Sequence, residues 1–173
     1  MVEPTENHIL PDVLDCGLVL VFCGTAAGKR SAAEHAYYAH PGNLFWRALY
    51  QAGLTPSLFA PVEFPLLPRY GIGLTDLAKR HSGNDNEPPR DAFDIDALRA
   101  KVHRYQPRLL AFTSKNAARA VLGHAVHYGL QGETVGVTQM FVLPSPSGQA
   151  RGHWNVSLWL ALGELYHSLR AHR

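Results

Sequence analysis

Short apolar segments alternate with segments of helical periodicity along this chain, and this alternation limits the fold more than any other feature. Leu18 to Cys23 is apolar throughout and rich in β-forming residues, which is typical of a strand covered on both faces. Leu109 to Thr113 and Gln139 to Leu143 have the same character, and Tyr70 to Ala78 contains a shorter extended segment. Strands that alternate with helices predict an α/β fold with a central, mainly parallel four-stranded sheet and helices on both faces.

Four segments carry the signals of helices. Asn43 to Gly53 has aromatic and aliphatic residues at helical spacing and ends at a glycine, a common C-cap. Asp94 to Pro107 opens with an aspartate cap and ends before proline, and we also expect helices at Lys115 to Leu122 and Val156 to Ala171. His81 to Asp91 is polar and rich in turn residues, which predicts a loop.

Composition sets the limits on domain count and cellular context. The chain has 173 residues, 46% hydrophobic and 17% charged, so we expect one globular domain over residues 1–173. The net charge of +2 permits a nucleic-acid partner without requiring one. Cys16 and Cys23 form neither a C-x-x-C pair nor a disulfide framework, which favours a reducing cytoplasm. The polar first residues and short apolar runs predict neither a signal peptide nor a membrane span. We therefore expect a monomer in a bacterial-type cytoplasm, at the nucleoid when acting.

The stretch from Phe22 to Ser31, FCGTAAGKRS, looks like the phosphate-binding P-loop of nucleotide hydrolases but departs from it twice. Cys23 stands where the first P-loop glycine belongs, and Arg30 stands where the hydroxyl that binds magnesium belongs. The stretch therefore needs another explanation. In parallel sheets, ligands bind beyond the carboxyl ends of the strands. Three loops fall there: Gly24 to Asn43, Gly73 to Asp76, and Pro144 to Arg151.

Five collinear segments cover most of the chain from Leu10 to Arg151: LPDVLDCGLVLVFCGTAAGKRSA, YYAHPGNLFWRALYQAGL, YGIGLTDLAKR, YQPRLLAF and VLPSPSGQAR. Together they resemble the mismatch-specific uracil/thymine-DNA glycosylases of the uracil-DNA glycosylase superfamily. The resemblance implies a three-layer α/β/α sandwich and an enzyme that needs no metal or cofactor. It also implies a DNA partner, from which a flipped-out base is cleaved at its N-glycosidic bond to leave an abasic site.

The chain departs from that family at its two motifs. The first motif of the family is usually Gly-x-Asn-Pro-Gly, with an Asn that positions the attacking water, whereas Ala26 stands at the Asn position here. The second motif usually opens with Asn, Met or His before Pro-Ser, and here it opens with Ser145. A related branch that removes hypoxanthine also lacks the first-motif Asn and carries its catalytic Asn in a stretch like YYAHPxNxFW, which this chain matches with YYAHPGNLFW. Asn43 is the matching residue.

The resemblance implies a base pocket built from small residues and one aromatic ring. We expect Gly24, Thr25, Ala26 and Gly28 to form its wall, where backbone N–H groups could stabilise the leaving base as an oxyanion hole does. Tyr38 matches the aromatic residue that stacks on the base, and this role is favoured over the alternative of a core aromatic beside Tyr37. Ser145 completes the expected substrate contacts.

Three residues are candidates for the chemistry. Asn43 would position water, with His40 as a second contributor, while the alternatives are a helix cap and a structural histidine. Asp76 lies where thymine-removing relatives carry an Asn that reads the base edge. An ionised Asp could accept a hydrogen bond from uracil N3–H or position water, but it would repel a leaving anion unless burial raised its pKa. The remaining alternative is a helix-capping Asp.

Contacts to DNA are expected from two places. Lys29 and Arg30 could touch phosphates or simply be solvated. The segment SPSGQAR resembles the loop that wedges into the duplex, which makes Ser147, Gly148, Gln149 and Arg151 candidates, although a plain Pro-Ser-Gly turn looks similar. The histidines are scattered without metal-ligand spacing, so no metal is expected.

Three functions remain open at this point. The favoured one is a uracil-DNA glycosylase of base-excision repair. The second is a glycosylase for hypoxanthine or another deaminated base. The third is a protein that binds abasic sites or flipped nucleotides with little turnover, since Ala26 and Ser145 replace two functional residues of the family.

Overall fold

The computed structural model describes residues 7–83, 88–148, 152 and 154–172, and its centre is a five-stranded sheet in the order β2-β1-β3-β5-β4. Four strands are mutually parallel: β1 (Leu20–Ala27), β2 (Ile72–Ser82), β3 (Leu109–Phe112) and β5 (Thr138–Val142). The mainly parallel α/β sheet is confirmed, but the predicted count of four misses β4 (Gly129–Val135), which pairs antiparallel with β5. Most β4 side chains are exposed or half-buried, so this edge strand has no apolar run to reveal it.

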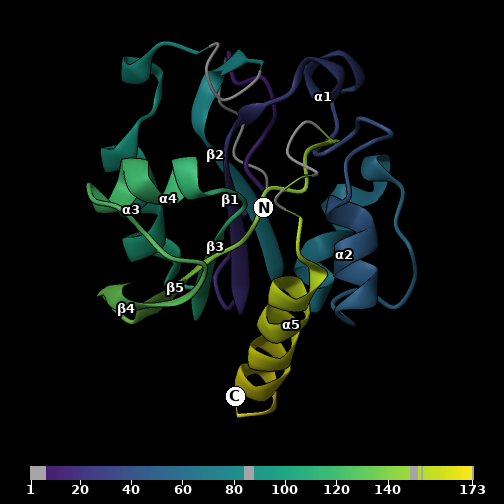
Figure 1. Ribbon diagram of the computed structural model, residues 1–173, viewed down its shortest axis with the longest axis vertical. Helices are drawn as coiled ribbons and strands as arrows, with labels where there is room; N and C mark the ends of the chain where they lie inside the picture. Colours follow the sequence, from purple (N-terminus) through teal and green to yellow (C-terminus); the bar gives the residue numbers. More distant parts are fainter. Residues whose placement is uncertain (1–6, 84–87, 149–151, 153, 173) are drawn as a thin grey trace.

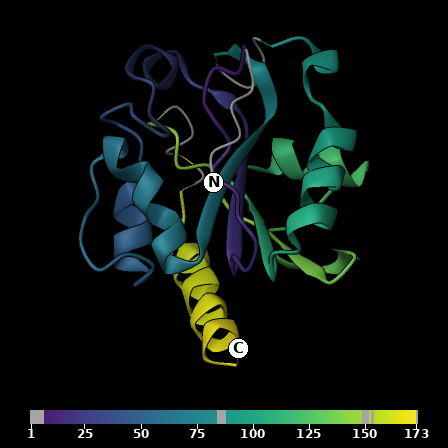
Figure 2. The same cartoon turned by 180° about the vertical axis from the view of Figure 1, so that it is seen from behind.

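Helices cover both faces of the sheet (Figure 1). On one side lie α2 (Phe45–Gln51), the 3₁₀ helix η1 (Pro61–Tyr70) and α5 (Val156–Ala171). On the other lie α3 (Ile95–Tyr105) and α4 (Lys115–Leu122), and Figure 2 shows the same layers from behind. The short elements are α1 (Lys29–Glu34), directly after β1, and the 3₁₀ helix η2 (Arg90–Ala92), before α3.

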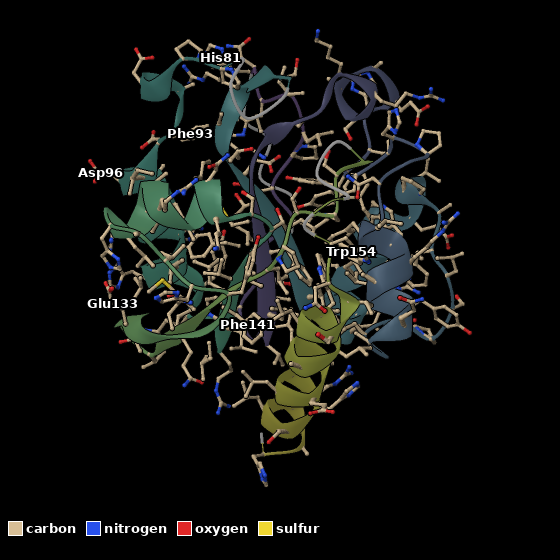
Figure 3. All side chains as sticks on the ribbon, in the orientation of Figure 1. His81, Phe93, Asp96, Glu133, Phe141 and Trp154 are labelled. Carbon is tan, nitrogen blue, oxygen red and sulfur yellow. The ribbon has the colours of Figure 1, made fainter. Side chains whose placement is uncertain are left out.

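Apolar side chains that alternate along the strands fill two cores, one under each helical layer. Phe22 and Phe141 pack with Trp159 of α5 in the first core, whereas Cys23 and Met140, their chain neighbours, face α3 and α4. Phe141 accordingly lies inside the molecule in Figure 3, while Glu133 of β4 lies at its periphery. The alternation places residues 22 and 24 of β1 on the same face, which positions the site described below.

Helices α3 and α4 begin at side-chain caps, of which only the Asp94 cap was expected from the sequence. Asp94 accepts a hydrogen bond from Ala97 N at 2.9 Å, and Ser114 accepts one from Ala117 N at 3.1 Å. The bounds of α4 and α5 are those expected from the sequence. Among the described residues, no helix is long and apolar enough to cross a membrane.

The segments that follow β1 and β3 run to opposite faces of the sheet. After β1 it enters the α2 layer, and after β3 it enters α4 in the other layer. Because β1 and β3 are neighbours, a crevice opens between their carboxyl ends, at the position where open α/β sheets bind ligands. His81, labelled in Figure 3, marks the same end of β2.

Candidate active site

A cavity of about 680 Å³ lies at these strand ends, and we refer to it as the strand-end pocket. Its wall includes all the expected substrate contacts, Gly24, Thr25, Ala26, Gly28, Tyr38 and Ser145. It also includes the expected catalytic residues His40, Asn43 and Asp76, and the expected DNA contacts Lys29, Arg30, Ser147 and Gly148. Gln149 and Arg151 lie outside the described residues. The fold thus gathers three segments that are distant in sequence into one cavity, although residues 73–76, expected to form a loop, lie within β2.

A fourth part of the wall was missed by the sequence analysis. Thr113, Ser114, Lys115 and Asn116 line the pocket, and so does Tyr128, whose ring lies 4.3 Å from the Lys115 ammonium. For residues 113–116 the available signal was their position directly after the buried strand β3, because the carboxyl ends of all parallel strands meet at one edge. Tyr128, just before β4, carried no such signal.

The first motif is a strand rather than the expected loop. Residues Gly24 to Ala27 form the second half of β1, and they pair with β2 from Gly24↔Asp76 to Ala27↔Ser82. Pairing of β1 with β3 ends earlier, at Cys23↔Phe112. The long neighbouring strand β2 therefore holds the motif extended. The other edge of the motif continues past the end of β3, beside the pocket.

Three polar side chains converge around Gly24. A Cβ atom at Gly24 would lie 2.7 Å from Asp76 Oδ1 and 3.4 Å from both Thr113 Oγ1 and Tyr38 Oη. The Tyr38 hydroxyl donates a hydrogen bond to Thr113 Oγ1 at 3.3 Å. We call Tyr38, Asp76 and Thr113 the polar trio. A glycine is required here because any side chain would displace the Asp76 carboxyl group, whereas a Cβ at Gly28 would meet nothing within 4 Å.

Asp76 is the least satisfied member of the trio. Only 6% of the residue is exposed, and no residue that the structure describes forms a hydrogen bond or ion pair with its carboxyl group. Every fully enclosed side-chain oxygen in the described part has a hydrogen-bond partner. Because the Asp76 carboxyl oxygens have none, they are open to the pocket that Asp76 lines. Burial raises the pKa of Asp76 from 3.8 to about 6, partly offset by the positive charge of Lys79. The expected helix-capping alternative is wrong, since Asp76 lies within β2.

A second buried carboxylate, Asp12, lies beside the same strand with a full set of partners. Its Oδ1 accepts a hydrogen bond from the Thr75 hydroxyl at 2.7 Å and lies 3.0 Å from Lys79 Nζ. Its Oδ2 lies 2.7 Å from Lys101 Nζ. Burial favours a higher pKa for Asp12, but the two ammonium groups outweigh it and lower the pKa.

Tyr38 presents an aromatic ring to the pocket in a fixed orientation. The ring stacks on Phe45 with centroids 3.9 Å apart and an interplanar angle of 15°, and Phe45 itself packs edge-on against Phe22. The backbone of Tyr38 is left-handed, with φ of 52°, a conformation that favours glycine and that must be enforced by the surrounding packing. Burial raises the pKa of the Tyr38 hydroxyl well above 10, so it stays a neutral donor.

His40 and Asn43 form a tight turn before α2. His40 Nδ1 accepts a hydrogen bond from Gly42 N at 2.9 Å, and the backbone N–H of Asn43 donates to the His40 carbonyl oxygen at 2.9 Å. Asn43 Oδ1 in turn accepts from Phe45 N at 2.9 Å, at the start of the helix. The N-cap of α2 is Leu44, so the expected N-cap alternative for Asn43 is wrong, although its side chain bonds to the first helical residue and lines the pocket.

The second motif is fastened to this turn. Leu44 N donates a hydrogen bond to Pro146 O at 2.8 Å, and a Cβ at Gly148 would lie 3.3 Å from Gly42 O. Ser147 N donates to Ser145 Oγ at 3.2 Å, which closes the loop locally. The second motif and the turn before α2 thus form one continuous part of the pocket wall. In the described part of the chain, no cluster of three or more His, Cys, Asp or Glu residues could hold a metal ion.

Comparison with known proteins gives this site a family. Residues 11–162 match the model of a family described as the uracil DNA glycosylase superfamily. The chain belongs to this superfamily. It is also similar to the solution NMR structure of a candidate uracil DNA glycosylase from Methanosarcina acetivorans, with a TM-score of 0.57 and 23% sequence identity. That match covers 91% of this chain and 96% of the other, and at this identity it supports the fold.

Membership in the uracil DNA glycosylase superfamily supports a DNA glycosylase activity and therefore DNA as the substrate. Basic side chains at the pocket suit such a polyanion, because Lys29, Arg30 and Lys115 all line it. Arg30 also forms an ion pair with Glu34, one turn later in α1. In this superfamily member, the strand-end pocket is thus both polar at its inner wall and cationic.

Proposed function

We propose that the protein excises uracil from DNA, hydrolysing the N-glycosidic bond of a flipped-out nucleotide and leaving an abasic site. Superfamily membership supports the reaction class. The observation that carries the choice of base is the unpartnered Asp76 carboxyl group, which lies beside the Tyr38 and Thr113 hydroxyls and lines the strand-end pocket.

The polar trio is complementary to the edge that deamination creates. Uracil offers an N3–H donor next to a carbonyl oxygen, whereas cytosine offers a ring-nitrogen acceptor next to an amino donor. A carboxyl oxygen of Asp76 can accept from N3–H, and the hydroxyls of Tyr38 and Thr113 can donate to the carbonyl oxygen. With cytosine, an amino donor would replace the carbonyl oxygen, so the hydroxyl protons of Tyr38 and Thr113 would lose their acceptor, and a buried unpaired polar group costs about 1–3 kcal/mol.

The other pocket residues have roles that follow from their places. Tyr38, already stacked on Phe45, offers its ring to the flipped base, and stacking contributes about 1–3 kcal/mol per base. Asn43 positions the attacking water, since Ala26 can neither orient nor activate it. The N–H groups of the first motif, Gly24 to Gly28, stabilise charge on the leaving base.

DNA contacts surround the pocket. Lys29, Arg30 and Lys115 bind phosphates, and Ser147 and Gly148 approach the backbone from the second motif. From their sequence positions, Gln149 and Arg151 fill the gap left by the flipped base. No metal or cofactor takes part in this scheme, and the protein acts as a monomeric single domain in the cytoplasm.

Hypoxanthine is the second candidate substrate because it carries the same N–H and carbonyl edge on a purine. The pocket volume of about 680 Å³ does not restrict the site to a pyrimidine. The combination of Ala26 with Asn43 also resembles the hypoxanthine-removing branch. The polar trio would read both bases in the same way, so their ratio must be measured.

The test uses labelled oligonucleotides with uracil, hypoxanthine, cytosine or thymine at one position, as single strands and as duplexes. After incubation with the protein and a chelator, alkali cleaves the strand only where a base has been removed. We expect cleavage at uracil, and none at cytosine. Binding without alkali-labile sites would show a damage-binding protein, and activity that needs a divalent ion would contradict the mechanism.

The water-positioning role is tested by Asn43→Ala. We expect turnover to fall at least about tenfold, equivalent to about 1.4 kcal/mol of barrier, while the protein still binds uracil-containing DNA. Unchanged turnover would leave Asn43 with its local hydrogen bond to Phe45 N alone.

A further inference from the structure

The unpartnered carboxyl group of Asp76 raises a problem for any glycosylase that releases its base as an anion. When the glycosidic bond of uracil breaks, its electron pair enters the base, and negative charge spreads to the ring carbonyl oxygens. Asp76 lines the pocket beside Gly24, so an ionised carboxylate there would repel this charge. The nearest neutral donors, Tyr38 and Thr113, also hydrogen bond to each other.

We propose that Asp76 enters the reaction as a neutral carboxylic acid and acts as a general acid toward the departing base. This inference rests on the proposed function. The carboxyl O–H donates to the uracil O4 oxygen while the carbonyl oxygen of the same group accepts from N3–H. As the C1′–N1 bond breaks, the proton moves to O4 and the base leaves as a neutral tautomer. Water adds to C1′, and the proton it releases restores the Asp76 acid.

The geometry favours the neutral acid in two ways. A carboxylic acid has a donor and an acceptor side by side, which matches both groups of the N3–H and O4 edge, whereas a carboxylate only accepts. A bound base also displaces water from the pocket that Asp76 lines, and this further disfavours charge on a carboxyl group that has no described partner.

Charged and titratable groups surround Asp76 on the neighbouring elements. Those that act on Asp76 or share its surroundings are Lys79, Asp12, Lys101, Tyr38, Tyr37 and Cys23. Lys79 and Lys101 favour the carboxylate, but both are bound to Asp12, which acts in the opposite direction. The net result is an Asp76 pKa of about 6, within reach of neutral pH.

The test combines a pH profile with a change of leaving group. Wild-type protein, Asp76→Asn and the control Asp91→Asn, an exposed residue remote from the pocket, are assayed on single-stranded DNA with uracil or 5-fluorouracil. Fluorine withdraws electrons, so 5-fluorouracil departs without needing a proton. For wild type and the control, we expect kcat/KM on uracil to be level below pH 6 and to fall about tenfold per pH unit above it.

For Asp76→Asn, we expect a loss of about 100-fold or more on uracil at pH 5.5, no fall through pH 6, and less than about a tenfold loss on 5-fluorouracil. Equal losses on the two bases would overturn the proposal, because the proton would then be irrelevant. A rise of wild-type kcat/KM through pH 6 would also overturn it, assigning the ionised form to water activation. If wild type removes neither base, the proposed function fails; if it removes uracil with a flat profile, only the general acid fails.

Discussion

Asp12 and Asp76 are two buried aspartates beside the same strand, and they differ in almost everything except residue type. Asp12 has three partners, Thr75, Lys79 and Lys101, all within 3.0 Å. Asp76 follows Thr75 directly on β2 but faces the opposite side of the sheet, where it meets a pocket instead of a cation. The pKa of Asp12 is lowered, and the pKa of Asp76 is raised to about 6.

The difference separates a structural charge from a functional one. A carboxylate surrounded by partners stabilises the fold and is chemically inert, because its lone pairs are already used. A carboxyl group buried without partners destabilises the ionised folded state, and such an arrangement is retained where a ligand supplies what is missing. Lys79 connects the two sites, since it binds Asp12 and its charge also acts on Asp76.

The largest effect should come from removing the structural carboxylate. Asp12→Ala leaves Lys79, whose side chain is 8% exposed, without its counter-ion, and we expect a loss of about 3–5 kcal/mol in the free energy of unfolding at pH 7. Urea denaturation measures this loss. Because the pKa of Asp12 is lowered in the folded state, its contribution is present above the unfolded pKa near 3.8 and disappears as the pH falls through the folded value. Asp91→Ala, at an exposed site, should change stability by less than about 0.5 kcal/mol. A similar small change in Asp12→Ala would remove the distinction between the two aspartates.

Asp76→Asn should have the opposite sign and stabilise the protein. A folded pKa of about 6 against 3.8 means that the ionised state costs about 3 kcal/mol of stability above pH 6. As the pH falls through 3.8 the acid becomes protonated in the unfolded state as well, and this penalty disappears. We therefore expect Asp76→Asn to be more stable than wild type by up to about 3 kcal/mol at pH 7.5 and nearly equal to it at pH 4, as measured by urea denaturation at both pH values. A variant less stable than wild type at pH 7.5 would show that the carboxylate is satisfied.

Gly24→Ala tests how closely the functional aspartate is packed. The new Cβ would lie 2.7 Å from Asp76 Oδ1, so the carboxyl group must move, and we expect turnover on uracil to fall at least about tenfold. Gly28→Ala is the matched control, because its Cβ would meet nothing within 4 Å. Single-turnover rates of both variants decide the matter, and equal rates would mean that the trio tolerates displacement.

The sequence predicted the frame of the molecule because its signals there are local. Apolar runs indicated the strands β1, β3 and β5, and the Asp94 cap indicated α3. Local pattern also explains the errors. Tyr70 to Ala78 was expected to contain a short extended segment, but β2 has 11 residues. Its polar end is held in the sheet by pairing with β1, so no apolar run marks it in the sequence.

The sequence predicted most of the residues that line the pocket, but not their hydrogen-bond partners or burial. Motif order placed Asn43 and Asp76 in one pocket, and the structure brings both there. Thr113 follows a strand without any motif, so only the rule about strand ends could have found it. The partners of Asp12 come from β2 and α3, so nothing in its local sequence distinguishes a paired aspartate from the unpaired Asp76.

The smallest expected effects come from two threonines that serve the two aspartates. Thr75 donates to Asp12 Oδ1, and Thr113 accepts from the Tyr38 hydroxyl within the trio. Thr75→Val removes a hydrogen bond to a charged group, so we expect a loss of about 1.5–3 kcal/mol in stability and no change in turnover. Thr113→Val should lose less than about 1.5 kcal/mol, because the Tyr38 hydroxyl remains open to the pocket, and should lower turnover on uracil several-fold. Urea denaturation and single-turnover assays on both variants measure the two quantities. If both variants lost stability and activity together, Asp12 and Asp76 would belong to one coupled unit, connected through Lys79, and the division into a structural and a functional carboxyl group would be wrong.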